Sequence, residues 1–193
     1  MAAHGTSVTR GGLLRRGAGA AGLVMVGVPA LVVAAQSTER ETEVLNLLLT
    51  VEYAEAAFYR QALDGGGLSG ELRSFAELVL GHEEEHLALV SGVLGDSAVE
   101  EPSYDFGEAT RAPDAFVDGS ARLEDLAVAA YNGQAANVSP EAFAAAARIV
   151  SVEARHAAWI RSIADRDPAP QTTDEPKTAA QVRAGLTQLG VKL

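Results

Sequence analysis

The residues of this chain that could do chemistry are glutamates and histidines in a repeated pattern. The motif Glu-x-x-His occurs twice, and a single glutamate precedes the two copies by 31 and 29 residues. A Glu and a His three positions apart on a helix project from one face, so each pair can offer two ligands to one point. The pattern is that of a duplicated half-site, made of Glu52, Glu83, His86, Glu124, Glu153 and His156.

Four carboxylates and two imidazoles gathered by four helices form the ligand set of a dinuclear iron or manganese centre. By ligand type this set suits Fe or Mn better than copper or zinc. We therefore expect two metal ions as cofactors. They are either Fe or Mn, and the sequence does not choose between the two metals. The four carboxylates would balance the four positive charges of two divalent ions, which makes burial of the centre electrostatically tolerable.

A tyrosine follows each single glutamate by seven residues, at Tyr59 and Tyr131. Seven residues is close to two helical turns, so each tyrosine returns to the ligand face about 10.5 Å along the axis. Two interpretations are open. Each tyrosine is either a core residue whose hydroxyl is bonded nearby, or a phenol that hydrogen-bonds a ligand carboxylate or takes part in redox chemistry near the metals.

Apolar residues recur at steps of three and four around all of these positions, which is the period of an amphipathic helix. The first Glu-x-x-His pair lies within such a stripe, together with Phe75, Val79 and Val90. Charged side chains in a core-facing stripe are unfavourable unless they are paired or bound to metal. The sequence therefore predicts an all-α four-helix bundle that carries the centre in its core. A composition of 48% hydrophobic but only 5% aromatic residues suits close-packed helices.

The four predicted helices resemble the metal-bearing helices of ferritin-like domain proteins, and in pattern they are most similar to the desiccation-related group. The segments are LNLLLTVEYAEAAFY, GHEEEHLALV, ARLEDLAVAAY and IVSVEARHAAWIR. The resemblance runs from about Thr38 to Leu193. It implies a ferritin-like bundle in which Glu52 and Glu124 are terminal ligands, Glu83 and Glu153 bridge the metals, and His86 and His156 each bind one metal.

Capping residues and breakers predict where the helices begin. Thr38 with Glu41 can form a capping box at the start of the first helix, and Ser69 can cap the second. The stretch from residue 96 to about 113 is long enough for the crossover that a ferritin-like bundle needs between helices 2 and 3. Ser139, followed by a proline, is expected to begin the fourth helix. A proline-rich linker and a short amphipathic helix are expected after it.

The N-terminus is predicted to be an export signal. Residues 1–16 carry three arginines and no acid, residues 17–35 carry no charge, and Val33-Ala34-Ala35 offers the small residues of a signal peptidase site. Arg15-Arg16 resembles a twin-arginine signal, although glycine and alanine replace the usual Phe-Leu after the pair. The rival interpretation is an uncleaved anchor, because 19 uncharged residues can just span a bilayer.

The predicted organisation is thus a signal peptide at 1–35, a bundle at 36–166, and a linker with a C-terminal helix at 167–193. The mature protein is expected in the periplasm, in the cell envelope or outside the cell. A net charge of −11 argues against nucleic acid and anionic membrane surfaces as partners. Without cysteine the chain has no disulfide and no iron–sulfur cluster, so an electron donor must come from elsewhere.

A competing motif overlaps the first pair, because residues 82–86 read His-Glu-x-x-His, as in zinc proteases. In that interpretation His82 and His86 bind zinc, Glu83 is the general base and a downstream acid such as Glu108 is the third ligand. The second Glu-x-x-His pair is then unexplained. The favoured interpretation makes His82 a boundary residue beside the dinuclear site.

The expected activity is either the oxidation of Fe(II) by oxygen or the removal of hydrogen peroxide. Oxygen or hydrogen peroxide is thus an expected partner of the centre. This would make the protein a ferroxidase- or peroxidase-type oxidoreductase active in oxidative or desiccation stress. The alternative is a structural stress-protection bundle without catalysis, although such a bundle would gain stability by losing its buried charges. The oligomeric state, including a homo-oligomeric cage, is open.

Overall fold

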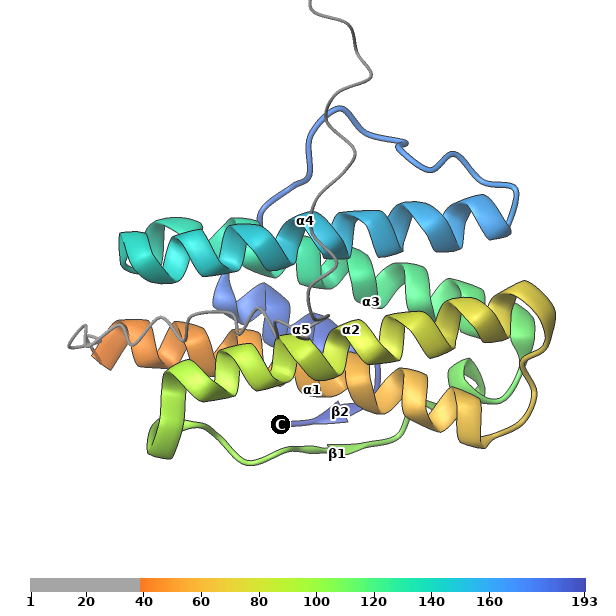
Figure 1. Ribbon diagram of the computed structural model, residues 1–193, viewed down its shortest axis with the longest axis horizontal. Coiled ribbons are helices and arrows are strands. Elements are labelled where there is room, and N and C mark those ends of the chain that lie inside the picture. The colour runs from red at the N-terminus through yellow and green to blue at the C-terminus, as the bar shows by residue number, and fades with distance from the viewer. Residues whose placement is uncertain (1–38) are drawn as a thin grey trace, which may run out of the picture. The chain divides into compact units, whose positions relative to one another are not determined.

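The computed structural model describes residues 39–193, which form a bundle of four long helices followed by a short fifth helix (Figure 1). The all-α architecture, the long crossover between the second and third helices and the short C-terminal helix confirm the fold predicted from the sequence. The helices are α1 (Glu39–Asp64), α2 (Gly70–Leu94), α3 (Pro113–Gln134), α4 (Pro140–Ile163) and α5 (Ala179–Gln188). Two strands and three short 3-10 turns complete the fold: β1 (Ser103–Tyr104), β2 (Val191–Lys192), η1 (Gly95–Ser97), η2 (Gly107–Thr110) and η3 (Ala135–Asn137).

The bundle consists of two hairpins that face each other. Helix α1 packs mainly on α2, and α3 packs mainly on α4; the contacts of α1 with α3 and of α2 with α4 are less extensive. The crossover that holds η1, β1 and η2 returns along the bundle, so α2 and α3 run parallel while α1 and α3 run antiparallel (Figure 1). These directions determine which ends of the helices can exchange side-chain contacts.

Three phenylalanines from three different helices form an aromatic cluster in the core. Phe58, Phe75 and Phe116 are at most 2% exposed. The rings of Phe58 and Phe116 are stacked with their centroids 5.5 Å apart, and those of Phe75 and Phe116 meet edge to face. Aliphatic residues of α1 fill much of the rest of the interior. Because these side chains recur with helical spacing, each helix buries one stripe, as predicted.

The helix starts agree in part with the predicted caps. Ser139 caps α4, because its hydroxyl accepts a hydrogen bond from the amide of Ala142. Ser69 stands at the N-cap position of α2 but makes no side-chain cap hydrogen bond, which corrects the prediction. Thr38 lies outside the described residues. Glu41, its predicted capping-box partner, accepts hydrogen bonds from the amide and the hydroxyl of Ser139 at 2.9 and 2.6 Å.

The C-terminal segment covers the side of the bundle formed by α1 and α3. Val182 and Leu186 of α5 are fully buried. A pairing that the sequence did not predict ties the chain's end to the crossover: β2 lies antiparallel to β1, with Ser103 opposite Lys192. The chain enters α5 so close to α3 that a Cβ at Gly133 would lie 1.9 Å from the Lys177 carbonyl oxygen.

Across residues 39–193, none of the helices combines the length and the hydropathy needed to cross a bilayer. The predicted signal segment, residues 1–35, lies outside the part of the chain that the structure describes.

Candidate metal centre

The structure brings all six predicted ligand residues together in the middle of the bundle, with at least one from each long helix. They form two overlapping groups, in each of which one ligand atom per residue lies within 4.8 Å of all the others. The first group, which we call the His86 position, consists of Glu52, Glu83, His86 and Glu153. The second group, the His156 position, consists of Glu83, Glu124, Glu153 and His156. We call these six residues together the candidate metal centre, or metal centre for short.

Two glutamates belong to both positions, and each directs one oxygen to each of them. Oε2 of Glu83 lies 3.0 Å from Nδ1 of His86, while its Oε1 lies 3.1 Å from Nδ1 of His156. Oε1 of Glu153 lies 2.8 Å from Nδ1 of His86, while its Oε2 lies 3.3 Å from Nδ1 of His156. A carboxylate with this orientation can bridge two ions.

The other two glutamates each reach a single position. Oε2 of Glu52 lies 3.5 Å from Nδ1 of His86, and Oε2 of Glu124 lies 3.3 Å from Nδ1 of His156. This arrangement corresponds to the one that the family resemblance implies, with two shared and two terminal carboxylates.

Buried oxygens without donors show that the centre fits cations. The four glutamates are fully buried. In each of them one carboxylate oxygen receives no hydrogen bond of normal geometry, although a histidine Nδ1 lies 2.8–3.5 Å from it. These oxygens are Oε2 of Glu52 and Glu124, and Oε1 of Glu83 and Glu153. Native proteins rarely leave such groups unsatisfied, because desolvating a charged oxygen without a partner is strongly unfavourable. Ions bound at the two positions would meet these oxygens.

Without metal, the two histidines carry the positive charge of the centre. Burial opposes their protonation, but contacts with the surrounding carboxylates outweigh it and raise the pKa of both His86 and His156 to about 12. Burial raises the pKa of Glu52 to about 8. For Glu153 burial acts in the same direction, but the contacts with His156 and His86 prevail and lower its pKa to about 2. Protons on Nδ1 thus occupy the places that metal ions would take.

Each of the two tyrosines hydrogen-bonds one of the two glutamates that reach a single position. These hydrogen bonds join α1 to α3. The hydroxyl of Tyr59 donates to Oε1 of Glu124 and lies 2.7 Å from the hydroxyl of Ser120. The hydroxyl of Tyr131 donates to Oε1 of Glu52. Burial, with the partner carboxylate adding to it, raises the pKa of both tyrosines well above the ordinary value. Both phenols therefore remain protonated donors, and each holds a carboxylate of the centre in place.

His82 lies beside the centre, where it contacts the ring of His156. Its Nδ1 is 2.9 Å from Nε2 of His156, and the two rings are stacked with centroids 5.1 Å apart. Burial and the neighbouring His156 lower the pKa of His82, so this ring is neutral and can accept the Nε2 proton of His156. Such a hydrogen bond fixes the orientation of a ligand imidazole.

The zinc-protease arrangement is not assembled. Within residues 39–193, neither group that could hold a metal includes His82 or Glu108. Glu108 lies in η2 with its side chain 75% exposed, where it pairs with Arg111.

Glu55 is a residue of the centre's surroundings that the sequence interpretation missed. It follows Glu52 by one helical turn on α1, is fully buried, and has no hydrogen-bond partner for either carboxylate oxygen. The signal was present, because a second glutamate three residues after a ligand shares its helical face.

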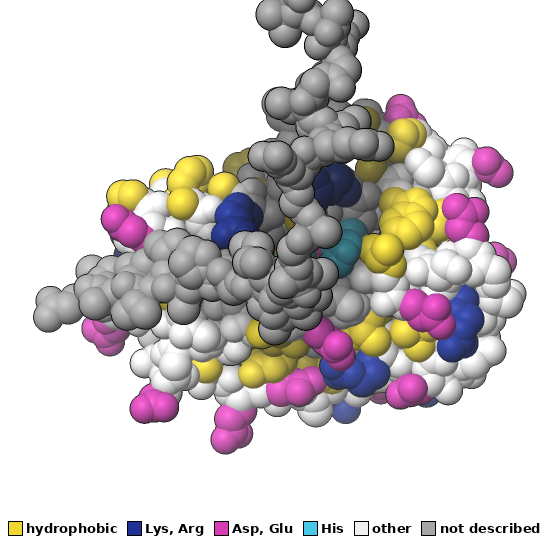
Figure 2. Space-filling view, viewed as in Figure 1, with side chains coloured by type: hydrophobic (Ala, Val, Ile, Leu, Met, Phe, Trp, Pro, Cys, Tyr) yellow, Lys and Arg dark blue, Asp and Glu magenta, His cyan; other side chains and the backbone are white. Residues whose placement is uncertain are grey.

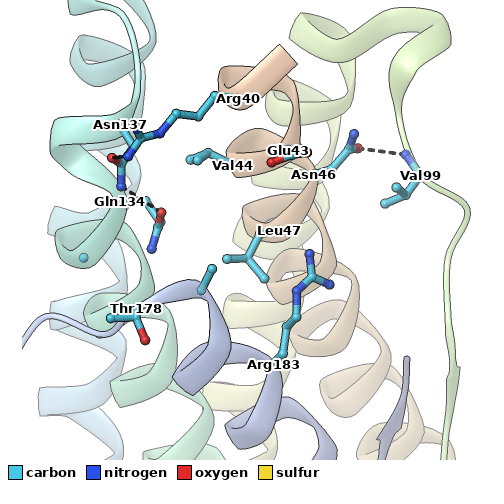
Figure 3. Close-up of a pocket in the computed structure, with 12 residues that line it drawn as sticks. Arg40, Glu43, Val44, Asn46, Leu47, Val99, Gln134, Asn137, Thr178 and Arg183 are labelled. Carbon is cyan, nitrogen blue, oxygen red and sulfur yellow. Dashed lines mark hydrogen bonds between the residues drawn. The ribbon is translucent and has the colours of Figure 1, made fainter. Parts of the chain in front are cut away.

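The centre lies closest to solvent on the side of α2 and α4. His82 is half-buried, and the His86 side chain is 11% exposed. Figure 2 shows histidine surface on the face of the molecule where α2 and α4 lie. A separate cavity of about 670 Å³ opens among the start of α1, the end of α3 and the start of α5. Arg40, Gln134 and Arg183 line it (Figure 3), and no residue of the metal centre does.

Comparison with known proteins agrees with this geometry. The sequence profile described as ferritin-like domain matches residues 40–166. None of the curated proteins compared matches the chain. The matched range includes the six residues of the metal centre and all four long helices except the first residue of α1. Because the match covers well over half of the sequence, the chain belongs to the ferritin-like domain family.

Proposed function

We propose that this protein binds two Fe or Mn ions in the metal centre and acts as an exported oxidoreductase that oxidises Fe(II) or removes hydrogen peroxide. Bound there, the ions would supply two-electron redox chemistry toward oxygen or peroxide. The observation that carries the proposal is the pair of buried glutamates, Glu83 and Glu153, that each direct one oxygen to both positions.

The chain's own residues support such chemistry in three ways. Glu52 and Glu124 complete the two positions, and the hydroxyls of Tyr131 and Tyr59 hold them in place. The buried phenols also stand where they could quench a stray one-electron oxidant. His82 orients His156 on the partly exposed side, from which a small oxidant would approach.

The binding of two ions is tested by metal content. Mass spectrometry of the purified mature protein is expected to find two Fe or Mn ions per chain. Glu153→Ala removes a carboxylate that both positions share, so it should empty both; Glu52→Ala should weaken mainly the His86 position. One zinc ion per chain, lost on His82→Ala but retained by Glu153→Ala, would overturn the proposal.

The reaction is tested on the same protein by stopped-flow mixing with oxygen and with peroxide. Protein loaded with Fe or with Mn should consume one of them faster than the free ions do. If protein that holds two ions reacts no faster than free metal, the catalytic part fails. The structural-bundle alternative would then account for the fold.

A further inference from the structure

The cavity among α1, α3 and α5 lies apart from the metal centre and has no part in the proposed function. Its volume of about 670 Å³ falls in the range of about 300–1,000 Å³ that is usual for small-molecule sites. The start of α1, the crossover residue Val99, the end of α3 and the start of α5 all contribute to its lining (Figure 3). Because segments far apart in the sequence converge there, the cavity is a product of the tertiary structure and not of one loop.

A chain of hydrogen bonds fixes one side of this cavity. The guanidinium of Arg40 donates to Oδ1 of Asn137, and Nδ2 of Asn137 donates to Oε1 of Gln134 at 3.1 Å. Gln134 is only 4% exposed, and its Nε2 donates to the carbonyl of Lys177 at 3.3 Å. These contacts join α1 to the end of α3 and to the chain that enters α5. This side therefore has a set arrangement before a ligand arrives, which reduces the entropy lost on binding.

The other side of the cavity in Figure 3 is fixed by Asn46 and is largely apolar. Nδ2 of Asn46 donates to the carbonyl of Ser97 at 2.9 Å, and its Oδ1 accepts from the amide of Val99 at 2.9 Å. These two bonds hold the crossover against α1, so that the side chain of Val99 lines the cavity. Val44 and Leu47, which are both buried, add further aliphatic surface to the lining.

The ionic side chains of the lining are two arginines and one glutamate, all of them exposed: Arg40, Arg183 and Glu43. Two guanidiniums against one carboxylate give the cavity a charge of +1, in a chain whose net charge is −11. Figure 3 shows Arg183 reaching from α5 toward α1.

Both guanidiniums have donors to spare. Within residues 39–193 neither Arg40 nor Arg183 pairs with a carboxylate; the arginines that do are Arg60, Arg73, Arg111, Arg161 and Arg166. A guanidinium with free N–H groups binds a carboxylate through two parallel hydrogen bonds. The cavity therefore combines anion-binding groups with an aliphatic wall.

We propose that this cavity binds a small organic monocarboxylate with an apolar body. Arg183 and Arg40 hold the carboxylate, and the apolar body lies against the aliphatic wall formed by Val44, Leu47 and Val99. A single negative charge matches the charge of +1 in the lining, whereas Glu43 would repel an anion of higher charge. No residue of the metal centre takes part, so the inference stands independently of the proposed function.

The test is calorimetric titration of the purified native protein with octanoate, which should bind saturably at one site per chain. Arg183→Gln removes a guanidinium and should weaken binding by about 10-fold or more. Val99→Asp, an exposed substitution in the aliphatic wall, should also weaken it. Glu43→Gln removes a like charge and should strengthen binding by about two- to fivefold. Arg122→Gln, an exposed change outside the cavity, is the matched control and should stay within about twofold of wild type.

Other probes test the two parts of the ligand separately. Octylammonium has the same apolar body with the opposite charge, and inorganic phosphate has charge without an apolar body; each should bind about 10-fold more weakly than octanoate, or worse. N-acetylleucine, titrated in parallel, distinguishes the carboxyl end of an apolar peptide from a fatty acid as the source of the carboxylate. Octylammonium that binds as well as octanoate, phosphate that binds better, or an Arg183→Gln variant with unchanged affinity would overturn the inference.

Two measurements locate the binding site, because a carboxylate can also ligate metal ions. Glu153→Ala, which is expected to empty both metal positions, should bind octanoate as wild type does. In nuclear magnetic resonance spectra of wild-type protein, octanoate should shift the methyl signals of Val44 and Val99. Shifts confined to other methyl groups, or octanoate binding lost together with the metals, would overturn the inference. Wild-type protein that binds octanoate but no metal ion would refute the proposed function alone.

Discussion

At the scale of single residues, the candidate centre is a set of buried acids around two protonated histidines. His86 and His156 each direct Nδ1 at three carboxylates. One N–H can donate along only one direction, so it satisfies one oxygen and leaves others without a donor. An ion bound in the same place would contact all of its ligands at once. The same buried geometry would therefore favour a metal-loaded state over the metal-free one.

Metal affinity is predicted to rise with pH. The pKa of both histidines is about 12 and that of Glu52 about 8 without metal, so all three groups hold protons at pH 7. An incoming ion must displace these protons, and lowering the pH strengthens the competition. Between pH 6 and 8 the apparent affinity for Mn(II) should rise about tenfold per pH unit for each proton released. Calorimetric titration in buffers of different ionisation enthalpy counts the protons; an affinity independent of pH would contradict the raised pKa values.

At the scale of elements, the antiparallel course of α1 and α3 joins the two halves of the centre. Moving along α1 from Glu52 to Tyr59 leads toward Glu124, and moving along α3 from Glu124 to Tyr131 leads back toward Glu52. Each helix therefore holds the ligand of the other in place. At its start α1 is tied to the start of α4 through the hydrogen bonds from Ser139 to Glu41.

Loss of this tie is predicted to destabilise the bundle. Ser139→Ala removes the cap of α4 and the hydroxyl that donates to Glu41, so it should lower the free energy of unfolding by about 1–3 kcal/mol. Ser69→Ala is the matched control, since Ser69 holds the N-cap position of α2 but makes no cap hydrogen bond. Its effect should stay below about 0.5 kcal/mol. Urea unfolding of the metal-free proteins measures both; equal losses would show that the contacts of Ser139 contribute nothing.

At the scale of the whole molecule, one side of the bundle is covered by the C-terminal helix and the opposite side is more exposed to solvent. Helix α5 covers the side of α1 and α3, with Val182 and Leu186 fully buried beneath it. On the side of α2 and α4, His82 is half-buried and large apolar side chains such as Leu78 and Phe143 are exposed. The covered side protects Glu52, Glu124 and their tyrosines from water. The other side brings the histidines near solvent, which suits the approach of metal and of a small oxidant.

We propose, from the sequence of its N-terminus, that the whole molecule is exported. Three arginines followed by an uncharged stretch precede the small residues at 33–35. The twin-arginine route transports folded proteins, so metal could be loaded before export. N-terminal sequencing of the native protein should therefore begin near Gln36, and replacing Arg15-Arg16 by lysines should retain the precursor in the cytoplasm. A native protein that begins within residues 2–10 would contradict cleavage.

The sequence by itself determined the helices and the six candidate ligands, because both depend on local spacing. A Glu and a His three residues apart share a helical face whatever the rest of the chain does, and an apolar stripe around them requires burial. The family match covers the same residues. Local spacing could not predict which residue of another helix each side chain contacts.

The tertiary structure alone decided those partners. Tyr59 and Tyr131 bond to glutamates 65 and 79 residues away, because the direction of the crossover sets α1 against α3. The same packing places His82 on His156, leaves Glu55 without a partner, and pairs β1 with the chain's last strand. These contacts join segments that no local period relates. They exist only once the two hairpins have docked and water has left the core between them.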